Sequence, residues 1–440
     1  MRYIPTSDAD REAMLSAIGL SSLDELFADI PAEILDGNKP LGLPSLTEQE
    51  VAATFSQLAQ RNPAARAFAS FQGGGIYDHY VPAIVPYVLS RSEFATAYTP
   101  YQPEISQGTL TAMFEFQTMI CELTGMEIAN ASLYDGATAL AEAALMANRI
   151  RRRHRIAVSR ALFAGVARVL QTYAWAAEIE LIELPIGPDG RTVFDHLPED
   201  LSAVLVQSPN ALGIIEDLRG VKDAIGDALL VVSVHPISLA IIEPPASVGA
   251  DIVVGEGQPL GLTRSFGGPL LGLFATQERY IRHMPGRIAG RTSDVDGRSG
   301  FTMTAQTREQ HIRRQRATSN ICTNSALCAL AATVYMASLG ADGLARVASA
   351  SARRAHDLCD RLEQISGVSR LFPGPFFNEF TVRVPQDPSR IHRALQQGGF
   401  LIDDPSDLSR LGVENAVRIA VTEKRTDEEL KRFTRVFEEA

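Results

Sequence analysis

Three apolar segments in the middle of the chain each lead to a polar side chain. The segment "AVLVQ" leads to Asn210, "LLVVSV" to His235 and "DIVVG" to Gln258. We expect these segments to be parallel strands, and ligands of open parallel sheets bind beyond the carboxyl ends of the strands. The three side chains therefore mark a candidate ligand site.

A loop of small and polar residues, "NASLYDG" (residues 130–136), precedes a predicted helix. Free backbone N–H groups at the start of a helix can hold a phosphate, and the helix dipole favours negative charge there. Small-residue loops before helices are also common where nothing binds. The order of loop, Asn, strand-end polar residue and strand-turn-glycine loop is nevertheless typical of enzymes that hold pyridoxal phosphate (PLP). From the loop, the candidates for lining the site are Ser132, Tyr134 and Asp135.

PLP chemistry requires two further residues, and neither is present. A lysine must hold the aldehyde, and a carboxylate usually keeps the ring nitrogen protonated. This chain has Gln258 at the lysine position and His235 at the carboxylate position, and it has no lysine between residues 223 and 423. We expect no confident catalytic residue and no metal ligand set in this chain, only degenerate cofactor positions.

Two irregular stretches supply the other candidates. The segment from residue 71 to 108 is rich in Tyr, Phe, Gly and Pro and shows no clear periodicity. Its rings either line a site or simply pack the loop. The loop "SFGGP" after Gln258 offers glycine N–H groups to an anion, or it forms a tight turn that needs positive φ. The candidates are Tyr77, His79, Tyr98, Tyr101 and Gln102 in the first stretch, and Gly267 and Gly268 in the second.

The surrounding elements predict how these residues are positioned. Strand patterns alternate with helical patterns from residue 137 onward, which predicts a mostly parallel sheet covered on both faces. A helix ending at Gly125 precedes them, and capping boxes are predicted at Ser22 and Thr47. We expect an α/β fold of the PLP-dependent transferase type (fold type I, aspartate aminotransferase-like). The predicted parts are an N-terminal helical segment (1–70), a large α/β domain (71–325) and a small C-terminal α+β domain (326–440).

Composition excludes some partners. The 440 residues carry a net charge of −11, which disfavours nucleic acid and anionic membranes as partners. No apolar run is long enough to span a bilayer, and the N-terminus lacks an apolar signal region. The four cysteines are scattered without a C-x-x-C motif, so we expect them to be buried and reduced, in the cytoplasm.

Several long stretches carry a resemblance to a known family. They are "FQGGGIYDHYVPAIVPYVLSRSEFATAYTPYQPEISQG", "FEFQTMICELTGMEIANASLYDGATALAEA", "QSPNALGIIED", "GEGQPLG" with "SFGGPLLG", and "TREQHIRRQRATSNICTN". The chain resembles the α-chain (subunit 1) of the two-chain P-protein of the glycine cleavage system, the glycine dehydrogenase (decarboxylating) family. Gln72, Gly74 and His235 depart from the family pattern.

The resemblance implies an activity and partners. In that family PLP is bound covalently by a lysine of the β-chain (subunit 2), the two chains form a heterotetramer, α2β2, and the enzyme is a glycine dehydrogenase (aminomethyl-transferring). It decarboxylates glycine and transfers the aminomethyl group to the lipoyl arm of the H-protein. In related folds the glycine loop reaches the neighbour's cofactor phosphate. Two alternatives stay open: an independent PLP enzyme, and a non-catalytic scaffold or regulatory paralogue.

Overall fold

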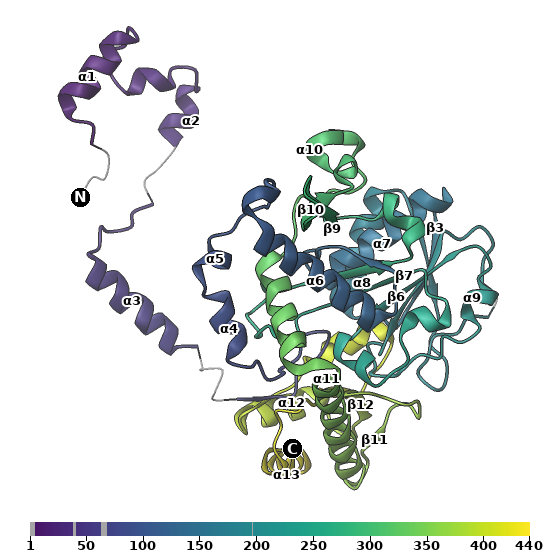
Figure 1. Cartoon of the computed structure of the whole chain (residues 1–440). Helices are drawn as coiled ribbons and strands as arrows, with labels where there is room; N and C mark the ends of the chain where they lie inside the picture. Colours follow the sequence, from purple (N-terminus) through teal and green to yellow (C-terminus); the bar gives the residue numbers. More distant parts are fainter. Residues whose placement is uncertain (1–4, 38–40, 63–67, 196) are drawn as a thin grey trace. The chain divides into compact units, whose positions relative to one another are not determined.

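The computed structural model in Figure 1 describes residues 5–37, 41–62, 68–195 and 197–440. The chain forms two compact units, residues 1–64 and residues 65–440, which are described separately. The first unit consists of short helices: α1 (Asp8–Ala17), α2 (Ala32–Gly37) and α3 (Glu48–Gln60). The capping box predicted at Thr47 is confirmed, because its hydroxyl accepts from the N–H of Glu50 and the Glu50 carboxylate accepts from the N–H of Thr47.

The capping box predicted at Ser22 is wrong. Only a four-residue 3-10 helix, η1 (Asp24–Phe27), begins there, and its N-cap Leu23 makes no side-chain hydrogen bond. The Glu25 carboxylate accepts instead from the backbone N–H of Ser21, at 3.3 Å. Ser22 therefore starts no α-helix.

A seven-stranded sheet forms the centre of the second unit (Figure 1). The predicted parallel sheet is confirmed for the five strands from β7 to β4, whereas β8 and β2 run antiparallel to their neighbours. In spatial order the strands are β2 (Ile128–Ala129), β8 (Gly272–Thr276), β7 (Ile252–Glu256), β6 (Leu229–Val234), β5 (Ala203–Ser208), β3 (Arg155–Ser159) and β4 (Glu180–Leu184).

Alternate residues of the central strands enter two different cores. Val204 and Val206 of β5 pack on one side, and Ala203 and Leu205 pack on the other. Because both faces are buried, the strands are apolar throughout rather than alternating with polar residues. The first face is covered by α6 (Gln107–Thr124) and α11 (Ala326–Leu362), and the second by α7 (Gly136–Arg151) and α8 (Ala164–Ala176).

Two glycines shape the helices of the first face. Gly125 ends α6 in the left-handed conformation, with φ of 74°, as the sequence predicts. Gly340 (φ 62°, ψ −179°) breaks α11 into two helical parts. The helix is long and apolar enough to cross a membrane by length and composition, but many of its apolar side chains are buried in the protein cores.

A third core lies in the C-terminal part of the chain. It joins the end of α11 to a three-stranded antiparallel sheet and two helices, and β1 pairs with β13 beside it. The predicted division into domains at residues 70 and 325 stays a prediction. The elements are β1 (Ala69–Ser70), β11 (Ser369–Arg370), β12 (Glu379–Arg383), α12 (Pro388–Gln397), β13 (Phe400–Leu401), β14 (Ala416–Ala420) and α13 (Asp427–Glu439).

Two expectations from the sequence need correction. The stretch 71–108 is not wholly irregular, because it contains α4 (Ile84–Leu89) and α5 (Ser92–Ala95). Cys322 is exposed and Cys121 only partly buried, whereas Cys328 and Cys359 are buried as expected. The remaining elements are α9 (Val221–Ala224), β9 (Ile288–Ser293), β10 (Ser299–Thr304), α10 (Gln310–Arg313) and the 3-10 helices η2 (Pro103–Ile105), η3 (Pro236–Ala240), η4 (Pro245–Val248), η5 (Glu278–His283), η6 (Gln306–Arg308), η7 (Arg314–Arg316) and η8 (Pro405–Leu411).

Candidate functional site

A cavity of about 310 Å³ lies at the carboxyl ends of β5, β6 and β7, where the sequence places the ligand site. The starts of α7 and α8 and the loop before α4 complete its wall. Most of the wall is apolar, including Phe163, Val166 and Leu270. The polar or titratable side chains that line it are Tyr77, Asp135, Gln207, Ser233, His235 and Glu256.

His235 contributes a neutral imidazole to this wall. The residue is 7% exposed, and its ring lies 4.4 Å from the Tyr77 ring, centroid to centroid. Burial holds the pKa of His235 well below its ordinary value, and the nearby His79 lowers it further. Among the described residues, neither ring nitrogen has a hydrogen-bond partner. A neutral imidazole cannot hold a pyridine nitrogen protonated as a carboxylate does.

The Gln258 side chain is fully used within the chain. Its amide oxygen accepts from the Tyr77 N–H at 2.9 Å, and its amide nitrogen donates to the carbonyls of Tyr77 (3.1 Å) and Leu262 (2.7 Å). The residue is 1% exposed. Gln258 therefore ties the aromatic segment to the end of β7, and no lysine is among the described residues that line the cavity.

Glu256 is a site residue that the sequence analysis missed. One carboxylate oxygen accepts from the Gly136 N–H at 2.9 Å, and the other from the N–H groups of Gln258 (2.9 Å) and Leu271 (3.0 Å). Burial raises the pKa of Glu256 to about 7, although these three bonds favour the charged form. The available signal was a single acidic residue between glycines at the end of an apolar strand.

Asp135 is a second acidic residue at the start of α7. It is the N-cap, and its carboxylate accepts from the N–H and the hydroxyl of Thr138, both at 2.8 Å. Two of the first three N–H groups of the helix are thus bound to carboxylates of this chain. Neither group is free for a phosphate, so the residues at this position do not fit the PLP phosphate.

Three other candidates are brought near the sheet edge but do not line the cavity. The Ser132 hydroxyl accepts from the Ser325 N–H at 3.1 Å, and the Tyr134 hydroxyl accepts from the Cys322 N–H at 3.0 Å. Both side chains thereby hold the segment that leads into α11. The Asn210 amide stabilises its own turn. Its oxygen accepts from two backbone N–H groups, and its nitrogen donates to Gly190 and Glu216.

A buried ionic network anchors the wall that carries Tyr77. The Tyr77 hydroxyl donates to Glu379 at 2.7 Å, and Arg418 contacts both Glu379 (3.1 Å) and Asp403 (2.8 Å). The backbone N–H of Gly74 donates to the same glutamate. Burial raises the pKa of Glu379 to about 7, and Arg418 opposes that rise. The glycine-rich loop before Tyr77 is therefore fixed on the C-terminal sheet.

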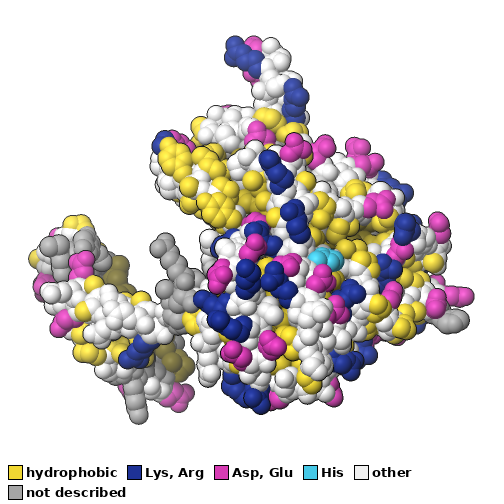
Figure 2. All heavy atoms as spheres, turned by 90° about the horizontal axis from the view of Figure 1, so that it is seen from below, with side chains coloured by type: hydrophobic (Ala, Val, Ile, Leu, Met, Phe, Trp, Pro, Cys, Tyr) yellow, Lys and Arg dark blue, Asp and Glu magenta, His cyan; other side chains and the backbone are white. Residues whose placement is uncertain are grey.

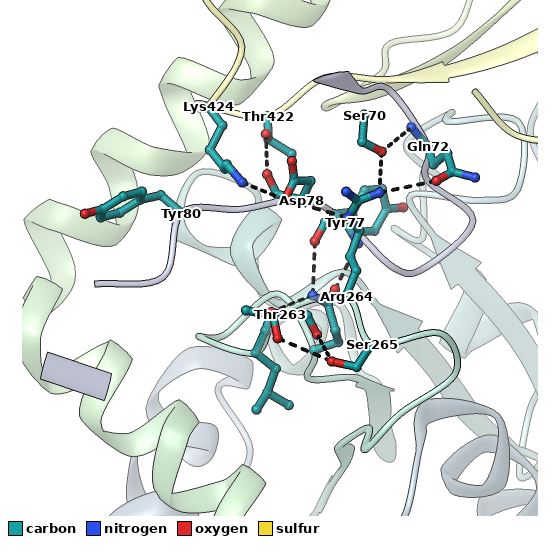
Figure 3. A network of polar contacts seen from close by, with 12 residues as sticks. Ser70, Gln72, Tyr77, Asp78, Tyr80, Thr263, Arg264, Ser265, Thr422 and Lys424 are labelled. Atoms are coloured by element: carbon teal, nitrogen blue, oxygen red, sulfur yellow. Dashed lines mark hydrogen bonds and ion pairs between the residues drawn. The ribbon is translucent and has the colours of Figure 1, made fainter. Parts of the chain in front are cut away.

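A second polar network surrounds Asp78 (Figure 3). Lys424 contacts its carboxylate at 2.7 Å, Arg425 at 3.1 Å and Arg264 at 3.7 Å. Arg264 also donates to the Ser70 hydroxyl at 2.6 Å. In the chain, Arg264 directly precedes the "SFGGP" loop. The next histidine, His79, is 4% exposed, and its Nδ1 lies 2.6 Å from the Glu423 carboxylate.

The remaining candidates face outward. Tyr98 is 87% exposed, Gln102 is exposed, and the half-exposed Tyr101 accepts a hydrogen bond from Arg287 at 3.2 Å. Gly267 and Gly268 have φ of 108° and 144° in an exposed loop. Seen from below, basic and acidic side chains are interspersed with hydrophobic ones (Figure 2). None of these outward candidates belongs to the cavity wall.

The sheet order and the place of the cavity define a class of protein. Solved structures of the same architecture include a NifS-like protein (14% identity, TM-score 0.61, covering 84% of this chain and 98% of that one). Another is a Lactobacillus brevis glutamate decarboxylase (13% identity, TM-score 0.68, covering 95% and 96%). At these identities the likeness shows the fold alone, and that fold is the predicted fold type I of PLP-dependent enzymes.

Full-length similarity then shows the family. The family model of the glycine cleavage system P-protein matches residues 1–437. Proteins named probable glycine dehydrogenase (decarboxylating) subunit 1 are 47% identical in Moorella thermoacetica (98% of this chain, 97% of that one) and 50% identical in Thermotoga maritima (90% of each). A crystal structure of glycine decarboxylase (P-protein) of the glycine cleavage system, in inhibitor-bound form, is 44% identical with a TM-score of 0.89 and covers both chains fully. The chain belongs to the glycine cleavage system P-protein family.

Proposed function

We propose that this chain is the α-subunit of a two-chain glycine decarboxylase. With a PLP-bearing β-chain it decarboxylates glycine and transfers the aminomethyl group to the lipoyl arm of the H-protein. The subunit 1 name of its relatives implies a second subunit. PLP in the partner supplies the electron sink for decarboxylation, and this chain supplies walls and donors around the shared site.

Two observations support the partner as the holder of PLP. The chain has the fold of PLP-dependent enzymes, but its lysine position carries Gln258, whose amide makes three hydrogen bonds within the chain. The phosphate position is taken by Glu256. Both features support a working cofactor in the other chain of the pair.

The exposed apolar side chains between residues 80 and 105 support a partner surface. Soluble monomers seldom expose many large apolar side chains together, and such surfaces are typical of interfaces. We name these residues the aromatic rim, and they include the candidates Tyr98 and Tyr101. Its members are Tyr80, Ile84, Tyr87, Tyr98, Tyr101 and Ile105, with exposed fractions from 44% to 87%.

We further propose an α2β2 assembly in the cytoplasm. Symmetric pairing is common among homologous subunits, and a diverged pair retains that arrangement. The four cysteines are free, which suits a reducing compartment. Nucleic acid and membrane are not among the proposed partners.

The test is reconstitution. Each chain is purified alone and both are co-expressed, and exchange of carbon dioxide with the carboxyl group of glycine is measured in all three preparations. We expect a stable heteromer, activity only when both chains are present, and no Schiff-base absorbance from this chain alone. A heteromer whose β-chain is equally active without this chain would favour a scaffold or regulatory role. Activity and visible Schiff-base absorbance in this chain alone would favour an independent enzyme.

A further inference from the structure

Glu256 is placed where a bound ligand's anion would be expected. Its carboxylate lies at the start of α7, a helix of 16 residues, and accepts hydrogen bonds from three backbone N–H groups. These groups belong to three different segments: the start of α7, the turn after β7 and the residue before β8. Three converging backbone donors at a helix N-terminus are the usual surroundings of a bound phosphate.

The backbone around this carboxylate is closely packed. A Cβ atom added to Gly136 would lie 2.7 Å from the Glu256 backbone nitrogen, so only glycine allows α7 to begin this close to β7. A Cβ atom on Gly272 would likewise lie 2.6 Å from the Asp135 carbonyl oxygen. The segments that would surround a phosphate are therefore drawn together around a side chain of the protein.

The rest of the cavity keeps the features of a ligand site. His235 is more than nine-tenths buried and lines the same cavity, and neither ring nitrogen has a hydrogen-bond partner among the described residues. The cavity of about 310 Å³ continues from Glu256 to His235. Thus the space for a ring remains, while the donors for a phosphate are occupied.

We propose that the Glu256 carboxylate is a built-in anion that occupies the position of a ligand's phosphate at the start of α7. It thereby prevents phosphorylated ligands, PLP included, from binding in this cavity. Its side chain joins the three segments as a bound phosphate would. This role concerns the chain itself and does not depend on the proposed function.

Removing the side chain tests the proposal. Glu256→Ala takes away four heavy atoms next to the cavity and leaves three buried N–H groups without an acceptor, so the variant loses stability. Inorganic phosphate should bind there and restore part of that loss. We expect a saturable rise of at least about 3 °C in the melting temperature of the full-length variant in millimolar phosphate, and no such rise in the wild type.

Matched controls separate binding from the general effect of phosphate, which stabilises folded proteins by exclusion from their surfaces. Glu216→Ala removes another buried glutamate, which bonds Thr192 and Asn210 but no helix N-terminus, and phosphate should not rescue it specifically. Glu256→Gln keeps the volume but places an amide NH2 group, which can only donate, against backbone N–H donors, so it should be destabilised and not rescued. Glu256→Ser is a second truncation with the same expected rescue.

The outcomes are decided by equilibrium dialysis with labelled phosphate and by a crystal structure. About one additional phosphate per chain at the Gly136 N–H in the truncated variants supports the proposal. Equal rescue of Glu216→Ala overturns it, as does phosphate at this position in the wild type. Failure of both truncations to fold or to bind phosphate also overturns it. The wild-type exchange assay is independent of all these measurements, so failure of the proposed function would be seen separately.

Discussion

The cavity at the ends of β5, β6 and β7 and the aromatic rim use polar and aromatic side chains in opposite ways. At the cavity, the lining residue Glu256 and the buried Gln258 are bonded to the backbone of their own chain. On the rim, Tyr98 is exposed, and the half-exposed Tyr101 accepts a hydrogen bond from Arg287. The same fold thus contains one site whose polar groups are bonded within the chain and one surface whose aromatic side chains are exposed. Changes in the first should cost mainly stability, and changes in the second should cost mainly function with the partner.

The largest expected effect is on stability, in the network behind the cavity. Arg418→Ala leaves the Glu379 and Asp403 carboxylates buried without their cation, and losing one partner of a buried pair costs roughly 3–5 kcal/mol. The measurement is the shift of the urea unfolding midpoint. The control is Arg219→Ala, which breaks a pair of 2.9 Å whose arginine side chain is 76% exposed and should shift the midpoint far less, because solvent screens exposed pairs. Equal shifts in the two variants would show that burial does not matter here.

The second effect concerns pH. The pKa of Glu256 is raised to about 7 from an ordinary value of 4.5, so the folded state binds this proton more tightly than the unfolded state. The resulting stabilisation is fully present below about pH 4.5 and is lost as the pH rises through about 7, a change of about 3 kcal/mol. Asp135 is the charged neighbour that adds to the rise.

Unfolding free energies from about pH 4.5 to 8 check this sign. Glu256→Gln cannot titrate, so its stability should fall less over this range than that of the wild type. The residual slope belongs to the other groups, among which Glu379 has a pKa of about 7 as well. Parallel curves for the two proteins would mean that Glu256 does not titrate in this range.

The sequence predicted the framework better than the details of the site. Apolar strands separated by helices predicted the parallel sheet, because strands buried on both faces must be apolar throughout. Of the polar residues at strand ends, His235 lines the cavity and Gln258 is buried next to Pro259, which lines it; their assignment as degenerate cofactor positions stays a prediction. Asn210 is not among the residues that line the cavity, because its side chain satisfies its own turn, and its role at the site stays a prediction.

What the sequence could not show were contacts between distant segments. Glu256 meets Gly136 across 120 positions, and Tyr77 meets Glu379 across 302, and no local pattern encodes such pairs. Asp78 was passed over for the same reason, because its partners Arg264, Lys424 and Arg425 lie far away in the chain. The sequence singled out Tyr98 and Tyr101 of the rim by composition, and their role stays a prediction; the exposure of the rim depends on how α4 and α5 are placed.

A third, smaller effect is expected at the glycine loop. We propose that the loop at Gly267 and Gly268 approaches the partner's cofactor phosphate. The Gly268 N–H closes the turn by donating to the Ser265 carbonyl at 3.2 Å, so the Gly267 N–H is the proposed donor. Gly268→Val should then weaken PLP retention by the intact complex by roughly 1–3 kcal/mol, the cost of an unmade bond to a buried anion. PLP release is measured by dialysis and absorbance.

The strain of placing valine at positive φ needs its own control. Gly297 has φ of 79°, lies in a different exposed turn and has open space around it. Gly297→Val therefore carries comparable backbone strain without touching the glycine loop, and it should leave PLP retention unchanged. Equal PLP retention in both variants would reduce the loop at Gly268 to a structural turn.

The smallest expected effect is on PLP binding, where we expect that restoring a lysine creates no Schiff base. Gln258→Lys restores the residue type that a PLP enzyme requires, yet we expect no Schiff-base absorbance from this chain when PLP is added. The new ammonium would be buried, the three hydrogen bonds of the Gln258 amide would be lost, and the fold should be weakened by about 1–3 kcal/mol. The absorbance of the full-length variant with and without PLP is the measurement.

Two features other than the lysine explain this expectation, and they can be removed one at a time. Glu256 occupies the phosphate donors, and the neutral His235 cannot keep the pyridine ring protonated. A Schiff base in Gln258→Lys alone would contradict the role given to Glu256, because the phosphate would then have bound despite it. In the double variant with Glu256→Ala, a PLP Schiff base should form but remain without decarboxylase activity, since His235 is unchanged. Activity would show that the buried imidazole can serve the ring after all.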